Sequence, residues 1–226
     1  MYDFLYNSTS FEQLKIHSQH TMVLECTVSW TSLQKLSLSF SRLSDESMAK
    51  ILSGCPILEN LTLYDCWELK VLDLSKSLRL RTLDVNRTVT YLWPTQIVAP
   101  HIHCLGLFNS ELSCTLVDIS SLTEAKLEIA LLPLNPDINA DFLQVRVLEM
   151  LDKLKNVEKL TLGRNFIQIL YLAEIRGVPF PILKVKTLTL DTKIFQYVIP
   201  VVFLDIYLKF EGFNLKECGI SKDGVS

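Results

Sequence analysis

The segment Gly54–Leu63 reads GCPILENLTL, and the leucine spacing in its last six residues decides the fold. Leu61 and Leu63 alternate with polar residues, which is the pattern of a short strand buried on one face. Leu58, three residues before Leu61, can pack into the layer beneath that strand. The spacing therefore predicts a strand with one leucine face and one polar face open to water.

The same spacing recurs along the chain. Eight further stretches share it: Phe11-x-x-Leu14-x-Ile16, Leu33-x-x-Leu36-x-Leu38, Leu69-x-x-Leu72-x-Leu74, Leu80-x-x-Leu83-x-Val85, Ile102-x-x-Leu105-x-Leu107, Leu122-x-x-Ala125-x-Leu127, Val157-x-x-Leu160-x-Leu162 and Val185-x-x-Leu188-x-Leu190. Their central apolar positions lie 22, 25, 11, 11, 22, 20, 35 and 28 residues apart, mostly near the period of a leucine-rich repeat. The sequence thus predicts an α/β leucine-rich-repeat solenoid, with a curved parallel sheet on the concave side and helices and irregular segments on the convex side.

Local patterns predict what lies between these strands. Ser44 starts a helix whose Met48, Ile51 and Leu52 form an apolar stripe, and Gly54 ends it before Pro56. The two steps of 11 residues leave no room for a helix. We therefore expect the segment 69–85 to contain a short extended return on the convex side, or one motif that is convex rather than part of the ladder.

Two later segments have helical spacing, 142–156 clearly and 199–210 more weakly, and Asp137 or Asp141 could cap the first. Cys66 occupies the position where the repeat places Asn or Cys, so we expect its thiol to turn inward toward the backbone of the neighbouring turn. The expected domain limits are a short extension at 1–10, repeats at 11–215 and a tail at 216–226.

Composition narrows the class of protein. The 226 residues include 41 leucines and carry a net charge of −3 with the two signs mixed, which indicates neither a nucleic-acid footprint nor a membrane anchor. The first residues lack a basic segment and the apolar run of a signal peptide. Six cysteines show no Cys-x-x-Cys pair and suit free thiols. We expect a cytoplasmic or nuclear protein, in which the sequons at Asn7, Asn60 and Asn86 are chance matches.

The polar positions of the predicted strands are the candidate contacts for a protein partner, because they face the open concave side. These candidates are Lys15, His17, Lys35, Ser37, Asn60, Thr62, Tyr64, Thr82, Asp84, Asn86, Phe108, Lys126, Glu128, Lys159, Thr161, Thr187 and Thr189, with Gln13, Gly106 and Asp191 in equivalent places. Any one of them can equally be an ordinary solvated residue. Tyr64, Trp67 and Phe108 stand out as aromatic hot-spot candidates, although Trp67 can instead cover the convex edge of the core.

Residues that could carry chemistry are sparse. His101, His103 and Cys104 have the composition of a metal cluster, but no acidic or thiol partner stands at ligand spacing, so we expect the histidines to sit at a strand entrance. No nucleophile motif, phosphate-binding loop or dinucleotide fingerprint occurs. The sequence therefore predicts no enzyme activity, no metal and no cofactor.

The stretch from Ser29 to Cys66 resembles the repeats of plant F-box/leucine-rich-repeat proteins, above all in the Gly-Cys-Pro-x-Leu-Glu-x-Leu-x-Leu motif of Gly54–Leu63. Ala99–Ile102 and Pro181–Leu190 resemble them as well, and the resemblance covers residues 8 to 215. It implies the substrate receptor of a Skp–cullin–F-box ubiquitin ligase, in which an F-box holds the Skp-type adaptor and the repeats select the target protein.

The chain departs from that pattern at its start, because it opens almost directly into a repeat without a helical F-box. We therefore expect a truncated or partial receptor that binds a target protein of unknown identity but not the Skp-type adaptor or cullin, which would require an F-box upstream. The alternative is a stand-alone repeat scaffold or inhibitor with no role in ubiquitylation. Neither nucleic acid nor membrane is an expected partner.

Overall fold

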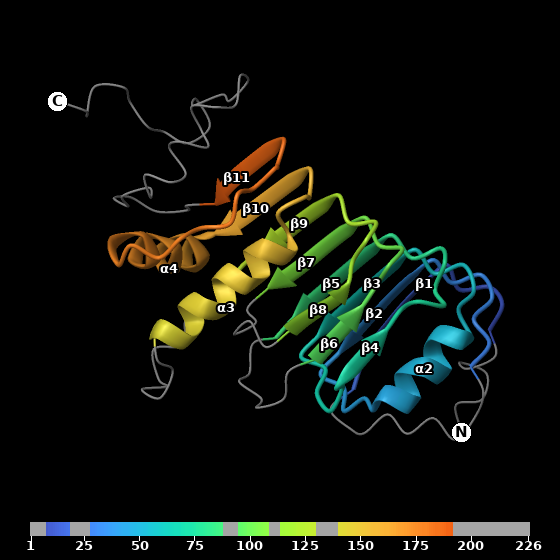
Figure 1. Cartoon of the computed structure of the whole chain (residues 1–226). Helices are drawn as coiled ribbons and strands as arrows, with labels where there is room; N and C mark the ends of the chain where they lie inside the picture. The colour runs from blue at the N-terminus through green and yellow to red at the C-terminus, as the bar shows by residue number, and fades with distance from the viewer. Residues whose placement is uncertain (1–7, 19–27, 88–94, 109–113, 130–139, 192–226) are drawn as a thin grey trace.

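A computed structural model of the protein describes residues 8–18, 28–87, 95–108, 114–129 and 140–191. Eight parallel strands stand side by side in one sheet that runs the length of the molecule (Figure 1). In spatial order they are β1 (Gln13–His17), β2 (Lys35–Ser39), β3 (Asn60–Tyr64), β5 (Thr82–Asn86), β7 (Cys104–Phe108), β9 (Glu124–Leu127), β10 (Lys159–Gly163) and β11 (Thr187–Asp191). This sheet is the concave wall of the predicted solenoid.

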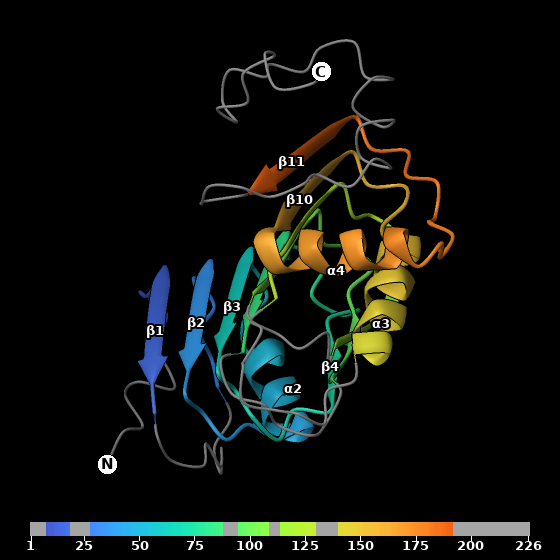
Figure 2. The same cartoon turned by 90° about the vertical axis from the view of Figure 1, so that its left-hand side faces the viewer.

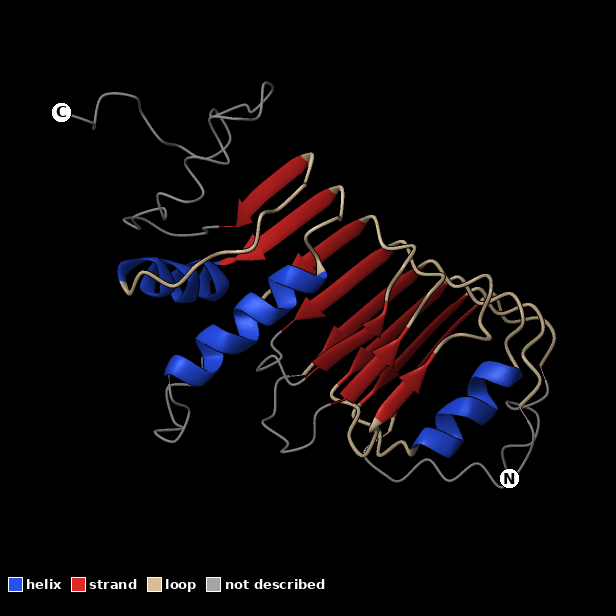
Figure 3. Ribbon diagram, in the orientation of Figure 1, coloured by secondary structure: helices blue, strands red, loops and turns tan. Residues whose placement is uncertain are grey.

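The opposite wall is built from mixed elements (Figures 2 and 3). Its centre is a second parallel sheet of three strands, β4 (Val71–Asp73), β6 (Thr95–Val98) and β8 (Cys114–Asp118). Helix α2 (Asp45–Ser53) precedes this sheet along the stack, and helices α3 (Ala140–Lys153) and α4 (Arg164–Ile175) follow it. No helix in the described part of the chain combines the length and the apolar character needed to cross a membrane.

The core lies between the two walls and consists mainly of the leucines of the repeated spacing. Leu61, Leu83 and Leu105 occupy matched positions on β3, β5 and β7, and each is at most 2% exposed. Leu72 on β4 buries its side chain into the same core from the other wall. Because burying one leucine stabilises the fold by about 1.5–3 kcal/mol, the repeated leucines hold neighbouring turns together. The prediction that one of the closely spaced motifs is convex is confirmed.

Helix α2 forms for the reasons that its sequence predicts. The Ser44 side chain accepts a hydrogen bond of 3.2 Å from the Ser47 amide, and Met48 and Ile51 are buried. Gly54 does follow the helix, but its φ of −83° is right-handed, so it is not the left-handed glycine that commonly terminates a helix. A Cβ at this position would instead lie 2.7 Å from the Val28 carbonyl carbon, so close approach of the backbone explains the glycine.

The remaining helix predictions have mixed outcomes. Helix α3 confirms the pattern at 142–156, although it begins and ends a few residues earlier. Asp141 is the second residue of α3, while Asp137 and the weaker helix at 199–210 lie outside the described residues, as does the expected tail. Strands β6 and β8 and helix α4 were not predicted from the sequence. The domain limits at 11 and 215 stay predictions.

Candidate protein-binding surface

The parallel register arranges the outward side chains of the eight-stranded sheet in rows. Strand β3, for example, pairs Thr62 with Ser37 on one side and with Asp84 on the other. All the predicted contact residues lie on this concave face, with Glu128 one residue past β9, and none of those with a side chain is fully buried. They are Lys15, His17, Lys35, Ser37, Asn60, Thr62, Tyr64, Thr82, Asp84, Asn86, Phe108, Lys126, Glu128, Lys159, Thr161, Thr187 and Thr189, and Gln13, Gly106 and Asp191 share the face. Their role in partner binding stays a prediction.

Aromatic rings meet at the carboxyl ends of the first three strands. The ring of Phe40 lies 4.8 Å from that of His17 and 5.0 Å from that of Tyr64, and both contacts are tilted. Phe40 follows β2 directly and has a φ of +55°, an uncommon backbone conformation for a residue other than glycine. Phe40 was not among the predicted contact residues, because it lies outside the alternating strand. An aromatic residue directly after a repeat strand is the signal that could have identified it.

A second cluster occupies the centre of the face, on β5, β7 and β9. Gly106 has no side chain, and the Phe108 ring and the Asp84 carboxylate fill the space above it. A Cβ at Gly106 would overlap Asp84 Oδ1 and lie 2.5 Å from Phe108 Cε2. On β9, the Lys126 ammonium lies 5.5 Å from the centroid of the Phe108 ring. Burial raises the pKa of the Asp84 carboxyl group, and the nearby charge of Lys126 lowers it in part.

Charge is unevenly distributed over the face. The outward positions of β1, β2 and β3 include Lys15 and Lys35 and no acidic residue. Beyond them, Asp84 stands on β5, and Glu124 on β9 forms an exposed ion pair of 3.7 Å with Lys159 on β10. The face therefore offers a basic end and a more acidic centre, which favours partners with a matching distribution of charge.

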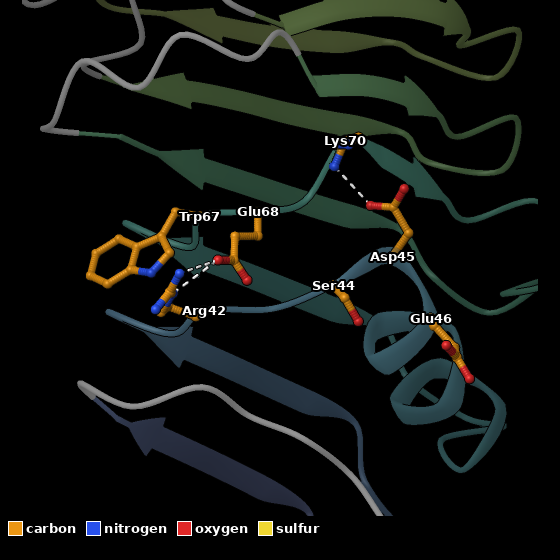
Figure 4. Close-up of a pocket in the computed structure, with 7 residues that line it drawn as sticks. All are labelled: Arg42, Ser44, Asp45, Glu46, Trp67, Glu68 and Lys70. Atoms are coloured by element: carbon orange, nitrogen blue, oxygen red, sulfur yellow. Dashed lines mark hydrogen bonds and ion pairs between the residues drawn. The ribbon is translucent and has the colours of Figure 1, made fainter.

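A groove of about 890 Å³ lies off this face, where the loops after β2 and β3 approach the start of α2 (Figure 4). It is lined by Arg42, Ser44, Asp45, Glu46, Trp67, Glu68 and Lys70. Trp67 is half-buried there, so it belongs to this groove, whereas Tyr64 and Phe108 lie on the concave face. Of the two roles considered for Trp67, the structure favours the cover at the edge of the stack.

The polar groups of the groove are already engaged within the chain. The Arg42 guanidinium donates two hydrogen bonds to Glu68 Oε1, one of them from Nε at 2.9 Å. Asp45 Oδ1 accepts hydrogen bonds from the backbone amides of Lys70 at 2.7 Å and Val71 at 3.1 Å. These contacts link consecutive repeats. The concave face, whose side chains are less engaged, is therefore the stronger candidate for binding a partner.

The remaining candidates have structural explanations. His101 and His103 immediately precede β7, which confirms their placement at a strand entrance, and the described residues contain no group of three or more metal-ligating side chains. The Cys66 thiol turns inward as predicted and donates a hydrogen bond of 3.5 Å to the Leu38 carbonyl oxygen. Burial raises the pKa of Cys66 to about 11, so it is a structural thiol rather than a reactive one.

Comparison with known proteins agrees with this architecture. The family described as "At1g61320/AtMIF1, LRR domain" (LRR denoting leucine-rich repeat) matches residues 4–222. The Arabidopsis thaliana protein named "Putative F-box/LRR-repeat protein At3g18150" is 52% identical over 99% of this chain and 54% of its own length. "Probable F-box protein At1g60180" is 48% identical over 98% of this chain and 77% of its own length, and "F-box/LRR-repeat protein At5g02910" is 47% identical over 99% and 54%; both are from the same plant.

The chain spans about half the length of the first and third of these relatives. No solved structure matches it. The family match covers all of the repeats described above, and the structure shows the parallel strands and leucine core that such repeats require. The chain therefore belongs to the At1g61320/AtMIF1 leucine-rich-repeat domain family.

Proposed function

We propose that this chain is a target-recognition module that binds another protein across its concave face and catalyses no reaction itself. The observation that carries the proposal is the continuous outward face of the eight-stranded sheet, on which side chains are exposed or half-buried and held in register. With about 4.8 Å between neighbouring strands, that face is about 34 Å long. Such a length suits the surface of a protein partner better than a small molecule.

The names of the relatives support a more specific role. The three relatives described above are named F-box or F-box/LRR-repeat proteins, and this chain matches only part of the length of each. We therefore propose that the repeats select the target of a Skp–cullin–F-box ubiquitin ligase in the cytoplasm or nucleus, with adaptor binding supplied by an F-box outside the repeats. A glycopeptide found at Asn60 in the native protein would contradict that location, because N-glycans are added to secreted proteins.

Photo-crosslinking from defined positions tests the binding face. A photoreactive residue at Thr62 or Thr161 points outward from the concave sheet, whereas one at Gln96 is exposed on β6 of the opposite wall and serves as the matched control. We expect the same discrete adduct from Thr62 and Thr161 in plant extract and none from Gln96. Equal adducts from both walls, or none from Thr62 and Thr161, would contradict the proposal.

A second experiment separates the ligase role from that of a stand-alone scaffold. Purified Skp-type adaptor is offered to this chain and to a version extended by the coding sequence upstream of Met1. Adaptor binding by the extended version alone supports a receptor whose repeats recognise the target. If neither version binds the adaptor while the concave-face adduct persists, the chain acts as a scaffold or inhibitor without ubiquitin chemistry.

A further inference from the structure

The carboxylate of Asp84 stands in the middle of the concave face, and none of the residues that the structure describes donates a hydrogen bond to it. Its neighbours in the same row are Thr62 on β3 and Gly106 on β7. Within the described residues, no side chain or backbone amide hydrogen-bonds to Asp84, and no cation forms an ion pair with it. A half-buried carboxylate without a donor is unfavourable, so this position is suited to receive one from a bound partner.

The aromatic ring of Phe108 lies directly beside that carboxylate because Gly106 leaves room for both. A Cβ at Gly106 would overlap Asp84 Oδ1 and approach Phe108 Cε2 to 2.5 Å, so the oxygen and the ring edge border the same small space above the glycine. Any larger residue at Gly106 would push at least one of them away. The strand register thus holds a carboxylate and a half-exposed ring together at one point of the surface.

A carboxylate beside an aromatic ring recognises an organic cation. The carboxylate accepts hydrogen bonds from the cation, and the ring attracts positive charge over its face. A guanidinium suits this pair better than an ammonium, because it is planar, stacks on rings and is more weakly hydrated. The chain itself shows the attraction, since the Lys126 ammonium lies 5.5 Å from the Phe108 ring centroid.

Lys126 does not fill the site. Its side chain is exposed, and although its charge lowers the pKa of Asp84, burial outweighs it and the net shift is upward. We propose that Asp84, Gly106 and Phe108 form a receptor for an arginine side chain of the bound protein, with Lys126 as an internal competitor that the arginine displaces. This inference rests on the proposed function, because it identifies what the concave face recognises at its centre.

Titration with N-acetyl-arginine amide tests the receptor directly. In the ¹⁵N-labelled chain we expect saturable amide shifts centred on Asp84, Gly106 and Phe108, with a dissociation constant on the order of millimolar for so small a probe. N-acetyl-citrulline amide has the same shape without the charge and should bind at least tenfold more weakly. Equal binding of the citrulline probe, or shifts scattered over the surface, would overturn the proposal. Equal binding of N-acetyl-lysine amide would overturn the preference for arginine.

Variants that should weaken arginine binding and one that should tighten it sharpen the test. Asp84→Asn and Phe108→Leu should each weaken arginine binding about tenfold, and Gly106→Ala should also weaken it by displacing at least one of these two groups. Lys126→Met removes the competitor and should tighten binding several-fold. Asp191→Asn, a carboxylate of the same face on β11, is the matched control and should change nothing. Thermal melting of each variant shows that it is folded. Weaker binding in Lys126→Met, or an Asp191→Asn effect as large as that of Asp84→Asn, would refute the receptor.

The two proposals fail independently of each other. The arginine titration requires no partner protein, so it can fail while the adducts from Thr62 and Thr161 persist. In that outcome the concave face binds its partner through other residues. If the titration succeeds and no adduct forms from the concave face, the receptor is real and the proposed function is wrong.

Discussion

Replacing Gly54 with alanine distinguishes two physical accounts of this position. Gly54 caps α2 in a right-handed conformation that any residue can adopt, so helix propensity alone predicts that alanine stabilises the protein by about 0.5–1 kcal/mol. The structure predicts the opposite. An alanine Cβ would lie 2.7 Å from the Val28 carbonyl carbon and 2.9 Å from Val28 Cγ1, and a backbone atom cannot rotate away as a side chain can.

The magnitude of that effect follows from the contacts. Overpacking typically costs about 1–3 kcal/mol. Moving the two segments apart also strains the 2.9 Å hydrogen bond from the Trp30 amide to the Gly54 carbonyl, which is worth about 0.5–1.5 kcal/mol. After subtraction of the gain in helix propensity, Gly54→Ala should lower the free energy of unfolding by about 2 kcal/mol.

Urea unfolding followed by tryptophan fluorescence measures this change, because Trp30 is 1% exposed beside the altered contact. Gly177 supplies the control: it has a φ of +70° and open space around its Cβ position, so alanine is disfavoured there by backbone conformation alone. Asparagine tolerates that conformation but is larger. Alanine should therefore be better tolerated than asparagine at 54, and asparagine better than alanine at 177. A stabilising Gly54→Ala, or the same order at both positions, would refute the reasoning.

Three further predictions concern the core, the backbone and the thiols. Leu61 is 0% exposed, so Leu61→Ala should lower the free energy of unfolding, measured by chemical denaturation, by about 2–5 kcal/mol. Thr62→Ala, on the open face of the same strand, should lower it by less than about 1 kcal/mol. Similar losses at the two positions would contradict the burial of Leu61 in the core. Glu68 has a φ of +73° and an exposed ion pair with Arg42, which both Glu68→Gly and Glu68→Ala remove. Because glycine adopts a positive φ more easily than alanine, the glycine variant should be more stable by about 1 kcal/mol in the same assay. The reverse order would contradict the left-handed backbone at this position. Burial raises the pKa of Cys55 to about 12 and that of Cys66 to about 11. Between pH 9 and 11 the folded state therefore keeps thiol protons that the unfolded state releases. The free energy of unfolding should fall as the pH rises through that window. A thiol-reactive dye at pH 8 should accordingly leave both cysteines unmodified until urea unfolds the chain, and rapid labelling of the folded protein would contradict their burial.

The leucine spacing predicts burial more securely than it predicts which wall a strand joins. Leu61 on β3 and Leu72 on β4 belong to the same motif, yet β3 lies in the concave sheet and β4 in the opposite one. Both strands bury leucines toward a shared core, so their local patterns are equivalent. Only the step of 11 residues between them indicated that one of the two had to lie on the convex side.

Elements without that spacing were missed for a related reason. Strand β6 buries Ile97 and strand β8 buries Cys114 and Leu116, so neither strand carries the repeated pair of core leucines. Both are stabilised by parallel pairing with strands about 20 to 25 residues away in the chain. The central cluster of the concave face depends on pairing in the same way. Asp84 and Phe108 could each be identified from the sequence as outward-facing, but their meeting above Gly106 follows from the register of β5 and β7.

The change of elements along the outer wall has a consequence for the shape that a partner meets. Where β4, β6 and β8 form that wall, both walls advance by about 4.8 Å per strand, so nothing forces the stack to bend. Where α3 and α4 replace the strands, each outer element is about 8–10 Å wide, so the outer arc is longer than the inner one and the stack must turn. A flat partner surface can therefore rest on β3, β5 and β7 alone, whereas a rounded one can follow the bend toward β10 and β11.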